Sequence, residues 1–373
     1  MPRKIIIDTD PGQDDAVAIL FALGSPELEV MALTTLAGNV PLEMTQRNAR
    51  IVLEIAGRGD IPVYAGCDAP LARPLVTAEH VHGKTGLDGI DLFEPTAALA
   101  PGHSVDALIR ILREEPAGSV TLVPIGPLTN IATAFQRAPD IIPRVQEIVL
   151  MGGAYFEVGN ITPAAEFNIF VDPEAAKIVF ASGAPLTVVP LDVTHGALTS
   201  RDWIETMRGT GPVGRAVAGW TDFFERYDRE KYGSEGAPLH DPCTIAWLLA
   251  PDLFQGRRIN VEIETQGEFT TGMTVADWWR VSGREANAMF LRHIDRDGFR
   301  KATPRTVLPQ HLLSSAMMRS MTSGSHCSSR RNSRTPPSQV RMSAISSCRH
   351  SMPRSVKALI PSSVPLSTQI ISP

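Results

Sequence analysis

Four aspartates crowd the N-terminal region of the chain. Asp8, Asp10, Asp14 and Asp15 fall within eight residues, and carboxylates at such spacing repel one another unless a positive group lies among them. A divalent cation would meet that need. Ligands that offer only oxygen favour calcium or magnesium over zinc. The first fifteen residues therefore predict a metal site.

The elements around this acidic loop explain how it would be positioned. Ile5–Ile7 is β-branched and predicts a short buried strand, Pro11 and Gly12 predict a turn, and a helix pattern begins at Ala16. The loop would then follow the carboxyl end of a strand, where open α/β sheets bind ligands. The positive N-terminal end of the helix would face the carboxylates.

The chain up to residue 299 alternates short apolar runs with amphipathic segments. We expect strands at 28–36, 61–65, 120–125, 147–151 and 186–191, and helices at 46–56, 105–115, 173–181 and 243–249. Such alternation predicts an α/β fold with an open, mainly parallel sheet covered by helices on both faces. Further strands are expected at 259–265 and 273–279, and the period of Ala288, Leu291 and Ile294 predicts a closing helix at 286–297.

Several polar residues fall where these strands end or in loops that could reach the same edge. Taken singly, each has a simpler explanation: Asn39 follows Gly38 as a turn residue would, and Asp241 before Pro242 is a suitable N-cap for the helix at 243–249. His82 belongs to a glycine-rich loop that could be a plain connection. The remaining candidates are Ile125, Met151, Asn160, Glu166, Asn168 and His240.

Together these residues form a recognisable series. The segment from Asp8 to Asp15 resembles the opening motif of the inosine-uridine preferring nucleoside hydrolases. The resemblance extends over about residues 3–299 and includes the segments 37–39, 82–83, 126–130, 151–153, 160–168 and 240–242. It implies the fold of that family, calcium as cofactor and hydrolysis of the N-glycosidic bond of ribonucleosides to ribose and free base.

The resemblance also implies a role for each matching residue. Calcium would be held by Asp10, Asp15, the main-chain carbonyl of Ile125 and Asp241, with a water and two ribose hydroxyls completing the shell. Asp10 would accept the proton of the attacking water, and His240 would be the acid for the leaving base. The positions expected to bind or line the substrate are Asp14, Asn39, His82, Met151, Asn160, Glu166 and Asn168.

The chemistry of the reaction agrees with that set of residues. Breaking an N-glycosidic bond builds positive charge on the ribose and negative charge on the base, so the site needs anions near the sugar and a proton donor near the base. The segment 220–233 predicts a helix and loop over the base, and Tyr227 is a candidate to stack on it. Packing of this helix by its aromatic residues explains them equally well.

Two other functions fit part of the pattern. Haloacid-dehalogenase-like phosphatases also open with a strand followed by Asp-x-Asp, and Asp8 and Asp10 satisfy that spacing, but the pair Asp14 and Asp15 is then unexplained. A non-catalytic nucleoside-binding protein is the second alternative. Ribose release tested with and without a chelator separates all three.

Composition divides the 373 residues into two parts. All 40 acidic residues precede residue 298, so the formal charge of −5 combines about −16 in residues 1–299 with about +11 in residues 300–373. We expect a catalytic domain at 1–299 and a basic, Ser/Arg-rich tail at 300–373 that is disordered. The tail is either a nucleic-acid-binding arm or, as we favour, non-native sequence from an altered reading frame, so no nucleic-acid partner is expected.

Other signals bear on location and assembly. The four cysteines lack metal or redox spacing, and no apolar run approaches about 18 residues, so a reducing cytoplasm and no membrane partner are expected. The N-terminus has a basic start, but the apolar run Ile5–Ile7 before Asp8 is too short for a signal peptide. The family resemblance implies a homodimer or homotetramer.

Overall fold

The central element of the fold is an eight-stranded sheet. The computed structural model describes residues 1–307, and its strand order is β3-β2-β1-β4-β5-β6-β10-β7. The strands are β1 (Arg3–Thr9), β2 (Leu28–Thr35), β3 (Val63–Ala65), β4 (Val120–Pro124), β5 (Val145–Met151), β6 (Leu186–Val189), β7 (Phe254–Ile259) and β10 (Ala288–Ile294). All neighbours pair in parallel except β7, which is antiparallel to β10. The predicted open, mainly parallel sheet is confirmed.

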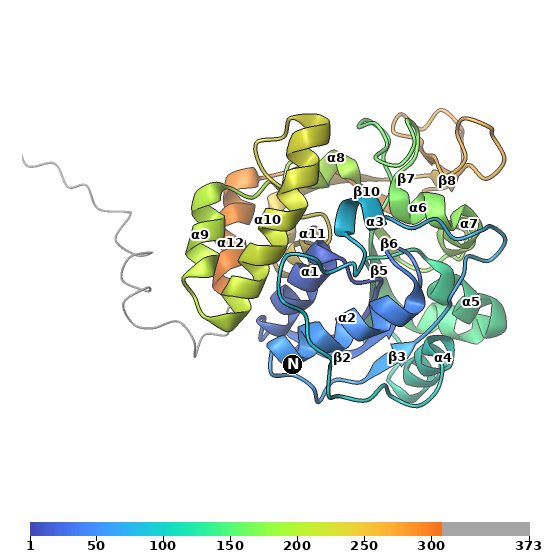
Figure 1. The fold of residues 1–373 in the computed structure, drawn as a ribbon. Coiled ribbons are helices and arrows are strands. Elements are labelled where there is room, and N and C mark those ends of the chain that lie inside the picture. The colour runs from blue at the N-terminus through green and yellow to red at the C-terminus, as the bar shows by residue number, and fades with distance from the viewer. Residues whose placement is uncertain (308–373) are drawn as a thin grey trace, which may run out of the picture. The chain divides into compact units, whose positions relative to one another are not determined.

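Helices cover both faces of this sheet (Figure 1). The longer ones are α1 (Gln13–Leu23), α2 (Leu42–Ile55), α4 (Ser104–Glu114), α5 (Thr129–Arg137), α7 (Pro173–Phe180), α9 (Arg201–Arg208), α10 (Pro212–Tyr232), α11 (Pro242–Leu249) and α12 (Arg296–Val307). Three short ones are α3 (Glu79–His82), α6 (Phe167–Val171) and α8 (Leu191–Thr194). Strand β1 shows the layering: Ile5 and Ile7 pack into one hydrophobic core with α1, while Ile6 packs into a second core on the opposite face.

The strand order creates a switch point between β1 and β4. From β1 the chain proceeds through β2 to β3 on one side, and from β4 it proceeds through β5 to β6 on the other. Loops leaving the carboxyl ends of the two central strands diverge and leave a crevice there, which is where doubly wound sheets bind ligands. Asp10 follows β1 and Ile125 follows β4, so both lie at this crevice.

The helix predicted at 286–297 is wrong. Ala288–Ile294 forms β10, between β6 and β7 in the sheet, and α12 begins only at Arg296. Apolar residues at every third position fit one face of a helix, but a strand that is buried on both faces can also have apolar residues at that interval. In β10 the side chains of Ala288, Phe290 and Leu291 are all buried. The segment expected as a strand at 273–279 contributes only β9 (Thr274–Ala276), which pairs with β8 (Val261–Ile263) in a separate two-stranded sheet.

Helix α12 passes through the boundary predicted between domain and tail. Phe299 is 1% exposed within the core that contains α1, and Arg300 donates from Nε to the carbonyl of Leu198. The expectation of a disordered tail concerns mainly residues 308–373, which lie outside the described residues. Within residues 1–307, no helix is long and apolar enough to cross a bilayer.

Candidate active site

A pocket opens at the carboxyl edge of the sheet, beside the switch point. All but one of the residues predicted to form the site line it: Asp14, Asp15, Asn39, His82, Ile125, Met151, Asn160, Glu166, Asn168, Tyr227, His240 and Asp241. The exception is Asp10, which is fully buried behind the lining. Segments separated by more than two hundred residues in the sequence thus meet in one cavity.

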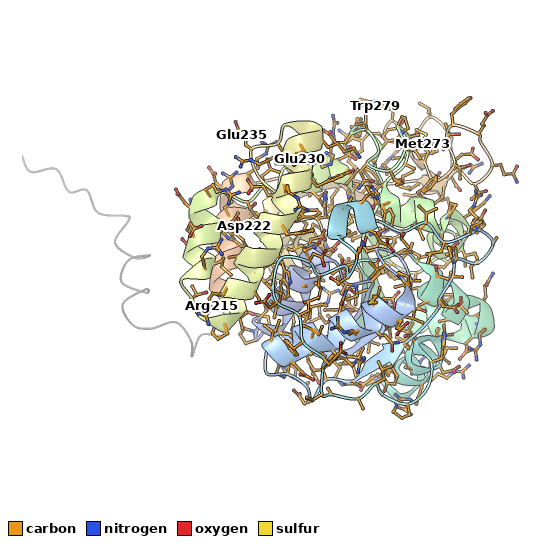
Figure 2. All side chains as sticks on the ribbon, viewed as in Figure 1. Arg215, Asp222, Glu230, Glu235, Met273 and Trp279 are labelled. Atoms are coloured by element: carbon orange, nitrogen blue, oxygen red, sulfur yellow. The ribbon has the colours of Figure 1, made fainter. Side chains whose placement is uncertain are left out.

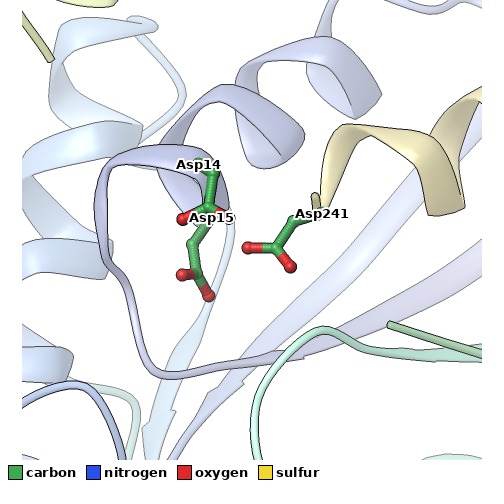
Figure 3. A group of neighbouring side chains, drawn as sticks. All are labelled: Asp14, Asp15 and Asp241. Atoms are coloured by element: carbon green, nitrogen blue, oxygen red, sulfur yellow. The ribbon is translucent and has the colours of Figure 1, made fainter. Parts of the chain in front are cut away.

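Three carboxylates converge at one end of this pocket. Asp14 and Asp15 lie at the start of α1 and Asp241 at the start of α11, and their side chains approach one another (Figure 3). Ligand oxygens of the three lie within 4.8 Å of one another, and all three residues are buried. Asp241 occupies the N-cap position of α11, but its side chain makes no capping hydrogen bond. The simpler explanation of Asp241 as a helix cap therefore fails.

The mutual repulsion of these buried carboxylates favours a bound cation. Burial raises the pKa of Asp14, Asp10 and Asp241 well above the usual range, and repulsion from neighbouring carboxylates adds to it. Buried carboxylates that repel one another are costly unless a positive charge neutralises them. The donors are all oxygen, so the cluster could hold a hard divalent metal ion.

Asp10 and Asp15 are held in place by the loops around them. Asp10 Oδ2 accepts from the backbone N–H of Asn39 at 2.7 Å, and Asp15 Oδ1 accepts from Thr9 Oγ1 at 2.6 Å. The other oxygen of Asp10, Oδ1, is buried and has no hydrogen-bond partner among the described residues. A Cβ at Gly126 would lie 2.3 Å from this atom, so only glycine leaves room for the carboxylate. An orphaned anionic oxygen beside three other carboxylates fits a bound cation.

The carbonyl of Ile125 also turns toward the site. Asn168 donates from Nδ2 to Ile125 O at 3.0 Å and to Met151 O at 3.2 Å. This amide ties the ends of β4 and β5 together below the pocket. Because Ile125 offers its backbone, its buried side chain remains free to pack in the core.

Glu166 and Asn160 shape the loop that follows β5. Glu166 accepts from the backbone N–H groups of Gly153, Asn168 and Ile169 at 2.9, 2.9 and 3.2 Å. Burial raises the pKa of Glu166, while these N–H donors oppose that rise. Asn160 Oδ1 accepts from Phe167 N at 2.9 Å. Both side chains line the pocket and also fix its wall.

Rings gather at the other end of the pocket. His240 Nδ1 and Thr194 Oγ1 are hydrogen-bonded at 2.7 Å, and burial lowers the pKa of His240 well below its usual value. His82 stacks on Phe224 with ring centres 5.5 Å apart, and Phe224 meets the ring of His240 edge-on at 6.3 Å. The site therefore has an acidic end and an aromatic end.

Asp8 does not belong to the pocket lining. Its Oδ1 accepts from Thr34 Oγ1 at 2.6 Å and from Asn130 Nδ2 at 2.8 Å, which ties β1 to β2 and α5. Burial raises the pKa of Asp8 to about 7. The first aspartate of the acidic series is thus tied into the sheet, while Asp14 and Asp15 face the pocket.

Eight residues that line the pocket were not predicted from the sequence, among them His195, Phe224 and Asp228. Phe224 and Asp228 lie one helical turn apart on α10. In the sequence Asp228 stands in a strongly charged run, which is typical of a solvated helix face, so only the packing of α10 against the site reveals it. The four-residue spacing between an aromatic and a carboxylate was the only available signal.

Comparison with known proteins agrees with this geometry. Residues 5–301 match the sequence model of the inosine-uridine preferring nucleoside hydrolases. The chain belongs to this family. It is therefore an N-glycosidase that hydrolyses ribonucleosides, and neither the phosphatase nor the non-catalytic alternative is supported.

Two relatives show how similar the chain is to known proteins. It is 54% identical to a protein of Schizosaccharomyces pombe over 79% of this chain and 96% of the relative. It is 52% identical to the pyrimidine-specific ribonucleoside hydrolase RihA of Photobacterium profundum, over 80% of this chain and 96% of that one.

Solved structures of nucleoside hydrolases share the fold. A plant nucleoside hydrolase superimposes with a TM-score of 0.78 at 35% identity, covering 82% of this chain and 99% of its own. A purine-preferring ribonucleoside hydrolase from Gardnerella vaginalis gives a TM-score of 0.77 at 32% identity, over 82% and 98%. The shared fold thus serves nucleoside hydrolases whose names record different base preferences.

Proposed function

We propose that this nucleoside hydrolase is calcium-dependent and prefers pyrimidine ribonucleosides. The observation that carries the catalytic part is the buried carboxylate cluster at one end of a pocket whose other end holds His240. The base preference is supported by relatives at about 50% identity that are named pyrimidine-specific ribonucleoside hydrolases.

The residues assigned to the cation are Asp10, Asp15, Asp241 and the carbonyl of Ile125. Bound there, calcium would lower the pKa of a coordinated water and anchor two ribose hydroxyls. Asp14 converges on the same cluster, and we assign its carboxylate to a ribose hydroxyl. The orphaned Oδ1 of Asp10 is the acceptor assigned to the proton of the attacking water.

The remaining polar residues are assigned to the sugar. Asn39, Asn160, Glu166 and Asn168 line the pocket with amide and carboxylate oxygens. Oxygen atoms fixed by backbone hydrogen bonds stabilise positive charge on the ribose without having to reorganise as it develops. Met151 closes the wall of the pocket beneath them.

At the aromatic end, His240 is assigned as the acid for the departing base. When Thr194 donates its hydroxyl hydrogen to Nδ1, the neutral ring carries its own hydrogen on Nε2. As negative charge builds on the base, this N–H donates a hydrogen bond to it; proton transfer proceeds from the imidazolium form, which gives its Nε2 proton to the base and returns to the neutral ring. Tyr227 and His82 are assigned to base contact at the same end.

His82 has a defined tautomer in this arrangement. Gln13 donates from Nε2 to the carbonyls of His82 and Asp88 at 2.9 and 3.0 Å, so its Oε1 must be the acceptor for His82 Nδ1 at 2.6 Å. Burial lowers the pKa of His82 to about 3. The ring is thus neutral and its Nε2 carries a lone pair.

A substrate panel tests this proposal. Ribose release should be fastest from uridine or cytidine, slower from inosine, and lost on complete removal of calcium, with recovery on adding it back. Release that survives complete removal would contradict the metal assignment, and a preference for inosine would contradict the base assignment.

We propose that the protein is cytoplasmic, which is supported by its free cysteines Cys67 and Cys243. We also propose a homodimer or homotetramer, which is supported by the family resemblance. Light scattering on the eluted protein checks the assembly, and a monomeric mass would contradict it.

A further inference from the structure

The aromatic end of the pocket contains a carboxyl group that the reaction described above does not use. Asp228 on α10 lines the pocket and is 7% exposed. Its Oδ2 is fully buried and, among the described residues, has no hydrogen-bond partner. Leaving a buried acceptor unpaired is costly, so such a group in a binding pocket points to a partner on the ligand.

The position of Asp228 places it near the base of a bound nucleoside. It follows Phe224 by one helical turn, and the Phe224 ring contacts both His82 and His240. Tyr227, its neighbour in sequence, meets the ring of His80 at 5.8 Å. The sugar is assigned to the carboxylate cluster, so we assign Asp228, which neighbours these rings on α10, to the base.

The charge around Asp228 determines what it can bind. Burial raises the pKa of Asp228 to about 7; Lys231 lowers it and Glu225 raises it further. Above that pH the carboxylate only accepts hydrogen bonds. It therefore attracts N–H groups and repels the carbonyl oxygens and ring nitrogens of a base that carry lone pairs.

We propose that Asp228 determines base specificity by accepting a hydrogen bond from an N–H group of the nucleobase, namely N3–H of uracil or the amino group of cytosine. This assignment rests on the proposed preference for pyrimidine ribonucleosides. His82 Nε2, a bare acceptor on the same side of the pocket, favours the same class of base. When a base without an N–H donor enters the pocket, the Asp228 carboxylate gains no hydrogen bond from it.

A competing role for Asp228 is contact with the ribose. The negative charge of Asp228 contributes to the raised pKa of Asp14, so the two carboxyl groups interact electrostatically. A ribose contact would affect every ribonucleoside equally, whereas a base contact would affect only bases with an N–H donor. This difference provides the test.

The experiment compares kcat/KM for uridine, 3-methyluridine and p-nitrophenyl riboside at about pH 8, above the Asp228 pKa of about 7. Methylation removes N3–H, and p-nitrophenol offers no N–H at all. The variants are Asp228→Leu, which has no acceptor, and Asp228→Asn, which keeps one oxygen. Glu230→Gln is the matched control, because Glu230 lies exposed on the same helix outside the pocket (Figure 2).

We expect the wild-type protein to favour uridine over 3-methyluridine by about tenfold or more. Asp228→Leu should reduce this ratio to within about threefold, Asp228→Asn should retain part of it, and Glu230→Gln should retain all of it. The loss caused by Asp228→Leu should be about tenfold greater on uridine than on p-nitrophenyl riboside. Removing an unpaired buried carboxyl should also raise the thermal midpoint.

Two results would overturn the assignment. Equal losses on uridine and p-nitrophenyl riboside would indicate a ribose contact or a structural role, and an unchanged ratio in both variants would exclude a base contact. If the wild-type protein cleaves inosine instead of pyrimidine nucleosides, the proposed preference fails separately. Asp228 is then tested in the same way with inosine and 1-methylinosine, which differ at N1–H.

Discussion

At the scale of single residues, the proposed reaction is divided between His240 and the carboxylate cluster at the two ends of one pocket. His240 is oriented by Thr194 through a 2.7 Å hydrogen bond, while Asp14, Asp15 and Asp241 converge at the opposite end. We therefore predict the effect of a substitution at each end separately.

Replacing His240 should affect substrates according to their leaving group. His240→Ala is expected to lower kcat for uridine by about 10²–10³-fold, a typical contribution of a positioned acid. The loss on p-nitrophenyl riboside should be below about tenfold, because p-nitrophenolate leaves without a proton. Steady-state kinetics on both substrates measure this, and equal losses would remove His240 from the acid role.

Replacing Asp241 should distinguish the repulsion among the buried carboxylates from their binding of a metal ion. In chelator, Asp241→Asn is expected to raise the thermal midpoint, because it removes one of several buried carboxylates that repel one another. Adding calcium should stabilise the wild-type protein by about 3 kcal/mol at a hundredfold excess over Kd, but not the variant. Differential scanning calorimetry measures both effects, and kcat/KM should fall more than about 100-fold.

Asp8→Asn is the matched control for Asp241→Asn. Asp8 lies outside the pocket lining, and an amide oxygen can still accept from Thr34 and Asn130. Its response to calcium should therefore equal that of the wild-type protein. A lost response in Asp8→Asn, or a retained one in Asp241→Asn, would contradict the assignment of the ligands.

At the scale of elements, α10 carries the aromatic end of the site and is joined to α9 by ion pairs. Arg201 on α9 contacts Asp222 at 2.6 Å and also pairs with Glu225, whose side chain is only 1% exposed. Arg229 also contacts Glu225, at 3.5 Å. Arg208 pairs with Asp222 and Glu205, both of them more exposed (Figure 2 labels Asp222).

These pairs predict unequal effects of two arginine substitutions. Arg201→Ala would leave the buried Glu225 poorly compensated and is expected to cost about 2 kcal/mol and to raise KM as α10 loosens. Arg208→Ala should cost about 0–1 kcal/mol, as exposed pairs do, and leave KM unchanged. Urea unfolding and uridine kinetics compare the two, and equal costs would show that burial of Glu225 does not matter.

At the scale of the whole molecule, α12 completes the core of the catalytic domain. Its Phe299 is 1% exposed and packs in the core that contains α1. Residues 300–373 have 18 serines, no acidic residue and no aromatic residue. We propose that the catalytic domain extends to Val307 and that the rest of the chain is dispensable.

Truncation tests this boundary. A chain ending at Val307 is expected to keep the thermal midpoint and the activity of the full chain. Phe299→Ala should cost about 3–5 kcal/mol, since it removes a fully buried aromatic ring. A clear loss of stability on truncation at Val307 would show that later residues pack on the domain.

The sequence by itself determined the family and the sheet, and it predicted many of the residues that line the pocket. The strand β1, the acidic loop after it and the strand-end residues Asn39 and Met151 are local patterns, and parallel topology brings strand ends to one edge. Period and composition could not distinguish a strand buried on both faces from a helix at Ala288–Ile294, because every side of either element can be apolar.

Only the tertiary structure decided what each carboxylate faces. Asp8 points into the sheet toward Thr34 and Asn130, while Asp14 and Asp15 face the pocket from α1. Asp228 sits in a charged run that indicates a solvated helix, yet α10 packs so that this carboxyl is buried and lines the pocket. Burial and missing partners depend on contacts between distant segments, so no local pattern could reveal them.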